Sequence, residues 1–94
     1  MIITISKHAG TFAENKDIAR DIRVQDIEPS LLLGETVTLD FMNVTGATQS
    51  FVHALISEPI RKYGDDIFDK LFFKNCSPTV QEIVNIVADY MEAS

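Results

Sequence analysis

Three hydroxyl side chains stand close together in the stretch "NVTGATQSF", residues 43–51. An alternating apolar segment precedes the stretch and an amphipathic one follows it, so it joins a strand to the start of a helix. A helix N-terminus carries free N–H groups and partial positive charge, which would stabilise a phosphate on Ser50. Hydroxyl groups are also common helix N-caps. Two interpretations of Ser50 therefore stay open: it accepts a phosphate, or Ser50, Thr48 or Gln49 simply starts the helix.

Asp40 ends the alternating segment just before these hydroxyls. Successive side chains of a strand point to opposite faces, which directs Asp40 away from the core. Its carboxylate could position a Lys or Arg of a partner protein. It could instead accept hydrogen bonds from the backbone amides of residues 45–48, as short polar side chains beside loops often do. The sequence favours this structural role.

The other groups able to perform chemistry are dispersed. His8, His53 and Cys76 do not show the spacing of a metal site, which needs three or four ligands. An enzyme would require a pocket that brings His8 or His53 within hydrogen-bond reach of Ser50, and nothing in the sequence orients such a pair. We therefore expect no catalytic residues, no metal and no cofactor.

Composition narrows the function classes further. The chain has 94 residues, the length of one small domain, so we expect a single domain over residues 1–94. The net charge of −6, with eight scattered Lys and Arg residues, argues against nucleic-acid binding. Cys76 is the only cysteine, which suits a reducing compartment. No apolar stretch resembles a signal peptide or a membrane span, so we expect a cytoplasmic protein without membrane contact.

Strands and helices alternate along the predicted chain. We expect strands at residues 2–5, 36–42 and 67–75, with a loop between 7 and 15 that contains a brief edge strand at 11–13. We expect helices from Asn15 to just before Pro29, from Gln49 to Tyr63, and from Pro78 to Met91. Pro59 should kink or break the second helix, because it cannot donate to the carbonyl of Leu55. Ser77 should cap the third helix.

This order predicts the architecture. Strand–helix crossovers are right-handed and produce parallel strands. If the strands are added to the sheet in one direction, every connecting helix lies on the same face. Residues 36–42 alternate cleanly, as expected for a strand that is covered on one face only. We therefore predict an α/β fold with a mostly parallel sheet of three to four strands in βαβαβα order and helices packed on one face. The leucines at 31–33 should pack beneath the sheet edge.

The bare face of such a sheet would expose a mixed polar and apolar patch. Its predicted members are Thr36, Thr38, Met42, Lys70 and Phe72. Apolar groups left exposed on a small sheet often mark an association surface. This patch, or an edge strand, is therefore a candidate homodimer interface.

Residues 38–55, "TLDFMNVTGATQSFVHAL", resemble the central strand–loop–helix of STAS domains, the fold of bacterial anti-sigma-factor antagonists. They are more similar still to the bacterial STAS-like family of small proteins of unknown function. The resemblance rests on Asp40, Phe41, Val44, Ser50 and Phe51. The flanks "GTFAENKDIARDIR" and "LFFKNCSPTVQEIV" extend it over nearly the whole chain.

The resemblance implies a regulatory signalling module that binds another protein and is not an enzyme. In anti-sigma antagonists a kinase-like partner phosphorylates a Ser or Thr at the start of the helix, and that position falls on Ser50. The chain departs from their motif at Thr48, where they have Asp, and at Phe51, where they have Gly. The implied partner is a histidine-kinase-like ATPase or another signalling component. The implied contact residues are Ser50, Thr48, Asp40, Thr45 and Phe51.

A second hypothesis concerns the acidity of the chain. A small acidic protein, for example one carried by a phage, could act as a stoichiometric inhibitor that competes for the basic channel of a nucleic-acid-handling protein. This hypothesis predicts carboxylates gathered on one face, whereas the sequence spreads them along the chain.

Overall fold

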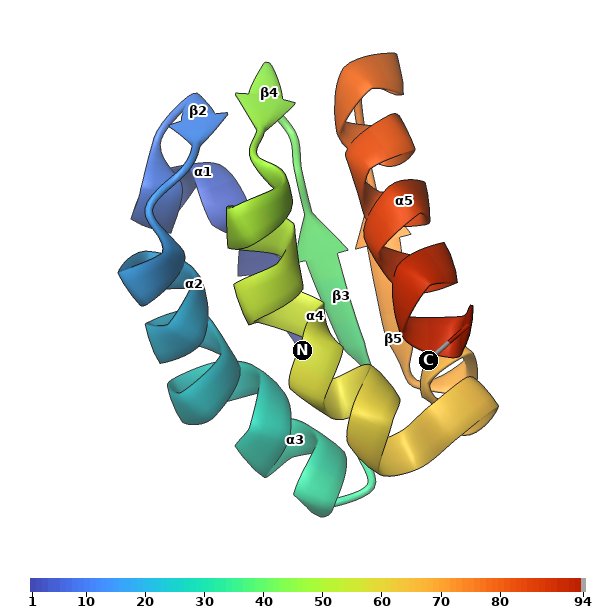
Figure 1. The fold of residues 1–94 in the computed structure, drawn as a ribbon. Coiled ribbons are helices and arrows are strands. Elements are labelled where there is room, and N and C mark those ends of the chain that lie inside the picture. Colours follow the sequence, from blue (N-terminus) through green and yellow to red (C-terminus); the bar gives the residue numbers. More distant parts are fainter. Residues whose placement is uncertain (94) are drawn as a thin grey trace.

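A parallel three-stranded sheet forms one layer of the molecule, which is described here by a computed structural model over residues 1–93. Its strands β1 (Ile2–Thr4), β3 (Val37–Asp40) and β5 (Leu71–Lys74) lie in the order β1–β3–β5 (Figure 1). Leu39 is the partner of Ile3 on one side and of Phe73 on the other. The predicted parallel α/β sheet is therefore confirmed.

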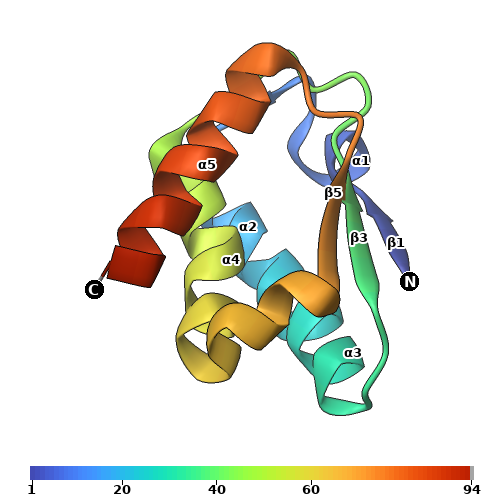
Figure 2. The same ribbon diagram turned by 90° about the vertical axis from the view of Figure 1, so that its right-hand side faces the viewer.

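Helices form the second layer. The helical segments are α1 (Ile5–Ala9), α2 (Lys16–Ile22), the π-helical turn η1 (Arg23–Ile27), α3 (Glu28–Leu32), α4 (Gln49–Tyr63), the 3₁₀ turn η2 (Gly64–Asp69) and α5 (Pro78–Ala93). Figure 2 shows α2, α4 and α5 on the same side of the sheet. α4 packs against both α2 and α5 (Figure 1). The prediction of helices on one face is confirmed.

The strands bury one face and leave the other bare, as the alternation predicts. Val37, Leu39 and Phe41 are fully buried beneath the helices. On the opposite face Ile2, Thr38 and Phe72 form one row across the three strands, and Thr4, Asp40 and Lys74 form the next. Ile2 and Phe72 are 63% and 43% exposed, and Met42 is 51% exposed just beyond β3.

The segment around Pro29 differs from its prediction. The chain stays helical up to Leu32, although Pro29 cannot donate a backbone hydrogen bond. The wide turn η1 precedes it, with the amide of Glu28 donating to the carbonyl of Arg23 five residues earlier. The helix therefore passes through Pro29 by widening. Of the leucines expected beneath the sheet edge, Leu31 is buried, but Leu32 and Leu33 are exposed at the end of α3 and just after it.

The N-terminal segment is also more structured than predicted. β1 ends at Thr4, and Ile5–Ala9 forms α1 where the sequence suggests the end of a strand and a loop. The brief strand predicted at residues 11–13 exists as β2 (Phe12–Ala13). It does not extend the main sheet, because it pairs in parallel with β4 (Gly46–Ala47) in a separate two-stranded sheet.

The C-terminal half keeps its predicted order of elements, with two differences in detail. α4 runs unbroken through Pro59, so the helix does not break there, and it ends at Gly64, whose φ is 63°. The third strand is shorter than expected, because Gly64–Asp69 forms η2 and only Leu71–Lys74 is extended. Ser77 caps α5 as predicted, its Oγ accepting from the amide of Val80 at 3.2 Å.

Candidate functional site

The loop after β3 is held to the N-terminal part of the chain by the β2–β4 pair. The carbonyl of Thr11 accepts two hydrogen bonds from Thr45, one from its amide at 2.7 Å and one from its hydroxyl at 3.0 Å. The amide of Thr48 donates to the carbonyl of Ala13 at 3.0 Å. These bonds lie on either side of β4, so they hold the second half of the loop, which leads into α4, against β2.

Thr48, and not Ser50, caps α4. The backbone of Thr48 is extended, and its Oγ1 accepts from the amide of Phe51 at 3.1 Å. Ser50 is the second residue of the helix and is exposed. Within residues 1–93 its hydroxyl forms no hydrogen bond. The start of the helix is therefore secured without Ser50, which leaves this hydroxyl available to other groups.

Asp40 joins two loops at the carboxyl end of the sheet. Its Oδ1 accepts from the amide of Met42 at 2.9 Å and from the side-chain amide of Asn75 at 3.0 Å. The hydrogen bond from Asn75, followed by that from Met42, lowers the pKa of Asp40 below its ordinary value. The structural role expected for Asp40 is observed, but its partners are these two groups and not the amides of residues 45–48.

The five predicted contact residues therefore differ in what they offer to a partner. Phe51 is fully buried, so its side chain supports the site from below. The hydroxyls of Thr45 and Thr48 are already engaged within the chain. Ser50 offers a free hydroxyl, and Asp40 offers the carboxylate oxygen that these bonds do not use.

An open groove of about 510 Å³ lies beside Ser50 on the helical layer. Its lining comes from the start of α2, the first turns of α4 and the second half of α5: Lys16, Gln49, Ser50, His53, Ala54, Ile86, Val87 and Tyr90. Sequence reasoning missed Lys16, Ile86 and Tyr90 as members of a site. One signal was present for the last two, since they stand four residues apart on α5, outside its buried stripe.

The groove brings together only part of the arrangement that an enzyme would need. Ser50 and His53 line it together, whereas His8 lies in a different hollow beside α2. Among the residues that the structure describes, no hydrogen bond joins Ser50 to His53 and no carboxylate binds His53.

Cys76 lies half-buried after β5, away from this groove. Burial raises the pKa of its thiol, and the negative charge of Asp40 adds to that effect. Over residues 1–93, His, Cys, Asp and Glu side chains form no group of three or more that could hold a metal ion. No helix in that range is long and apolar enough to cross a membrane.

Comparison with known proteins places this geometry in a family. Neither the curated proteins nor the solved structures give a significant match. Residues 23–81, well over half of the chain, match the profile of the STAS-like domain of unknown function (DUF4325). The match spans the strand, the loop, the capped helix and the next strand that position Ser50 and Asp40. The chain therefore belongs to the family of STAS-like domains.

Proposed function

We propose that this protein is a non-catalytic regulatory module of the cytoplasm that binds another protein through residues 43–50 and the first turn of α4. The resemblance of residues 38–55 to anti-sigma-factor antagonists, which act by binding another protein, supports the class of function. The partner proposed by analogy with anti-sigma antagonists is a histidine-kinase-like ATPase or another signalling component. Ser50 is proposed as the residue whose phosphorylation switches the contact.

One observation carries this proposal: Thr48 caps α4, so the exposed hydroxyl of Ser50 has no structural task. A phosphate on Ser50 would add about 1.5 to 2 negative charges at pH 7. Near the start of α4 this charge would be tolerated by the fold, because helix N-termini favour anions. At a protein–protein contact it would repel an acidic or apolar partner surface.

The experiment is a pull-down from the native host with wild-type protein, Ser50→Ala and Ser50→Asp, analysed by quantitative mass spectrometry. We expect wild type and Ser50→Ala to recover the same partner, and Ser50→Asp to recover at least tenfold less. Thr79→Asp is a matched control, since Thr79 is the exposed second residue of α5. Equal recovery by wild type and Ser50→Asp would refute the switch. Intact-mass analysis of the native protein would show the phosphate directly.

A second contact is proposed on the bare face of the sheet, where two copies would meet. A two-fold axis brings the same patch of both copies together, so the patch must complement itself. Here the exposed apolar side chains of Ile2 and Phe72 stand in one row, and Asp40 and Lys74 stand side by side in the next. Apolar groups would therefore meet apolar groups, and the carboxylate of one copy could meet the ammonium of the other.

Size-exclusion chromatography with light scattering tests this dimer. We expect wild type to run as a dimer at high micromolar concentration and Phe72→Ser as a monomer. Val24→Ser is the control, because Val24 is a similarly exposed apolar residue on η1. A wild-type protein that stays monomeric at that concentration would rule the dimer out.

A further inference from the structure

The groove beside Ser50 differs in charge from the rest of the molecule. The chain carries 14 acidic and 8 basic residues, yet the eight residues that line the groove include Lys16 and no carboxylate. The lining therefore contains a side chain that could attract an anion and no side chain that would repel one.

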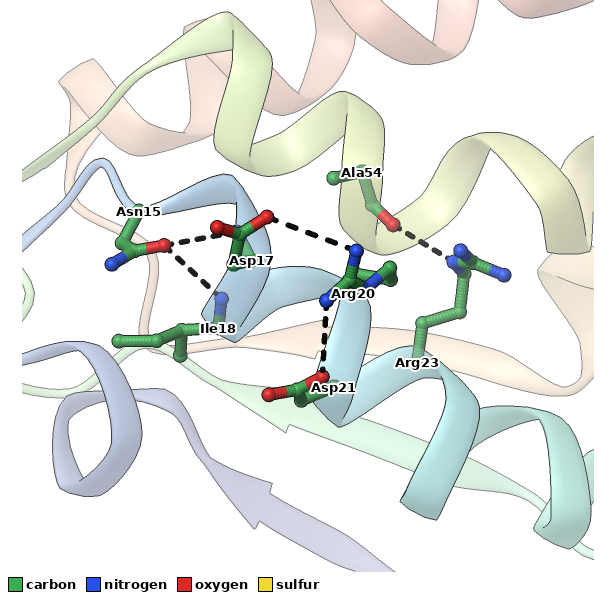
Figure 3. Close-up of polar contacts among 7 residues, drawn as sticks. All are labelled: Asn15, Asp17, Ile18, Arg20, Asp21, Arg23 and Ala54. Atoms are coloured by element: carbon green, nitrogen blue, oxygen red, sulfur yellow. Dashed lines mark hydrogen bonds and ion pairs between the residues drawn. The ribbon is translucent and has the colours of Figure 1, made fainter.

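The ammonium group of Lys16 is free to meet a ligand. Within residues 1–93 Lys16 forms no ion pair, whereas Arg20, Arg23 and Arg61 each pair with a carboxylate. The carboxylate next to Lys16 in sequence, Asp17, faces Arg20 at 3.9 Å (Figure 3). The charge of Asp17 is thereby partly balanced by another residue.

The rest of the lining divides into polar and apolar parts. Gln49, Ser50 and His53 add an amide, a hydroxyl and an imidazole, all able to hydrogen-bond an anionic head group. Ala54, Ile86, Val87 and Tyr90 supply an apolar wall. Ile86 is 42% exposed and Tyr90 is 66% exposed, so both retain apolar surface that a ligand could cover.

The size of the groove suits a small molecule. At about 510 Å³ it lies within the range of roughly 300–1,000 Å³ typical of small-molecule sites. Such sites combine mostly apolar walls with a few polar groups that fix the orientation of the ligand.

We propose that this groove binds a small organic anion, with an aromatic or aliphatic body against Ile86 and Tyr90 and a carboxylate or phosphate head at Lys16. Such a ligand would lie over Ser50 and would cover the hydroxyl that the proposed protein contact uses. The inference itself does not depend on that contact, because the groove, its charge and its apolar wall belong to this chain alone.

The test is a ¹H–¹⁵N NMR titration of the full chain with 4-phenylbutyrate, which combines an aromatic body with a carboxylate. Butyrate and inorganic phosphate each present an anion without the aromatic body, and 4-phenylbutanol presents the body without the charge. We expect 4-phenylbutyrate to shift the amide signals of Ser50, His53 and Tyr90 saturably. A dissociation constant of about 1 mM is expected for a probe of this size. The three partial probes should each bind at least tenfold more weakly.

Two variants and a control assign the interaction. Lys16→Gln should weaken binding of 4-phenylbutyrate about tenfold, and Ile86→Asn should weaken it by a similar factor. Lys7→Gln, which removes an exposed lysine of α1 that does not line the groove, should leave binding unchanged. The dispersion of each variant's spectrum shows whether it is folded, and Lys16→Gln changes only an exposed side chain.

Other outcomes would overturn the inference. The first is the absence of saturable shifts around the groove up to 10 mM 4-phenylbutyrate, about ten times the expected dissociation constant. The second is binding of 4-phenylbutanol with the same affinity as 4-phenylbutyrate. The third is an unchanged affinity for 4-phenylbutyrate in Lys16→Gln. None of these outcomes bears on the pull-down with Ser50 variants, so the two proposals fail separately.

Discussion

The side-chain amide of Asn75 donates a 3.0 Å hydrogen bond to the carboxylate of Asp40, 35 residues earlier in the chain. The two residues lie at the carboxyl ends of the neighbouring strands β5 and β3. Asn75 has a φ of 58°, in the left-handed region that asparagine tolerates better than most residues. The bond therefore joins the starts of the two loops that follow β3 and β5. The loop after β3 leads to Ser50.

This bond predicts how stability depends on pH. Because the pKa of Asp40 is lowered from 3.8 when the chain is folded, the unfolded chain binds more protons between the two values. Asp40 should therefore stabilise the fold above about pH 4, and this contribution should be lost as the pH falls through the lowered pKa. Urea denaturation between pH 2.5 and 6 should show a smaller acid-induced loss for Asp40→Asn than for wild type.

Two further variants test whether the hydrogen bond from Asn75 to Asp40 causes this dependence of stability on pH. Asn75→Gly keeps the left-handed backbone but removes the amide donor, so its acid-induced loss should also be smaller than that of wild type. Asp89→Asn alters an exposed carboxylate of α5 that forms no hydrogen bond or ion pair within residues 1–93, and should behave as wild type. If wild type and Asp40→Asn lose stability in parallel, the bond does not contribute to acid stability.

The second prediction separates the two hydroxyls at the start of α4. Thr48→Ala removes the cap on the amide of Phe51 and should lower the free energy of unfolding by about 1 kcal/mol. Ser50→Ala removes an exposed hydroxyl that forms no hydrogen bond within the chain, and should change the free energy of unfolding by less than about 0.5 kcal/mol. Urea denaturation of both variants measures the difference. An equal loss in both would mean that Ser50 shares the capping task.

The main elements could be predicted because their signals are local. Val37, Leu39 and Phe41 alternate with polar residues, and the structure buries all three. Ser77 and Pro78 likewise specify the start of α5 within two residues. The helical course through Pro29 was missed, because nothing near the proline announces the wide hydrogen bond from Glu28 to Arg23.

The candidate site was less accessible to sequence reasoning. The hydroxyls are visible in one short stretch, but the choice of Thr48 as cap depends on its extended backbone, which the sequence does not show. The groove joins Lys16, Ser50 and Tyr90 from three helices, and their distance along the chain hides their proximity. Short sequence motifs therefore identified side chains able to perform chemistry, whereas tertiary packing decided which of these side chains lie on the same surface.

A third prediction concerns the loop's contact with β2. A Cβ atom added at Gly46 would lie 2.8 Å from Cε1 of Phe12, closer than carbon atoms tolerate. Gly46→Ala should therefore push the Phe12 ring aside and cost about 1–3 kcal/mol of stability, the range for overpacked sites. Phe12 is 51% exposed, so the ring has room to move and the lower end is expected.

A double-mutant cycle checks that this cost comes from the ring. In a Phe12→Ala background, Gly46→Ala should cost much less than in wild type, because the clashing atoms are gone. Equal costs of Gly46→Ala in both backgrounds would place the strain in the backbone of β4 instead.

The last prediction compares two arginines that lie three residues apart (Figure 3). Arg23 is mostly buried: its Nε donates to the carbonyl of Ala54 in α4 at 3.0 Å, and its Nη1 pairs with Glu28 at 2.6 Å. Arg20 is exposed and faces Asp17 and Asp21 at 3.9 and 3.8 Å. Arg23→Met should lower stability by about 1.5–3 kcal/mol, since it removes the charged hydrogen bond to Ala54 in α4 and the ion pair with Glu28. Arg20→Met should cost no more than about 0.5 kcal/mol, because exposed pairs contribute little. Urea denaturation at low and at 0.5 M salt would test both variants. A similar loss of stability in the two variants would contradict the role given to Arg23 in holding α4 against η1.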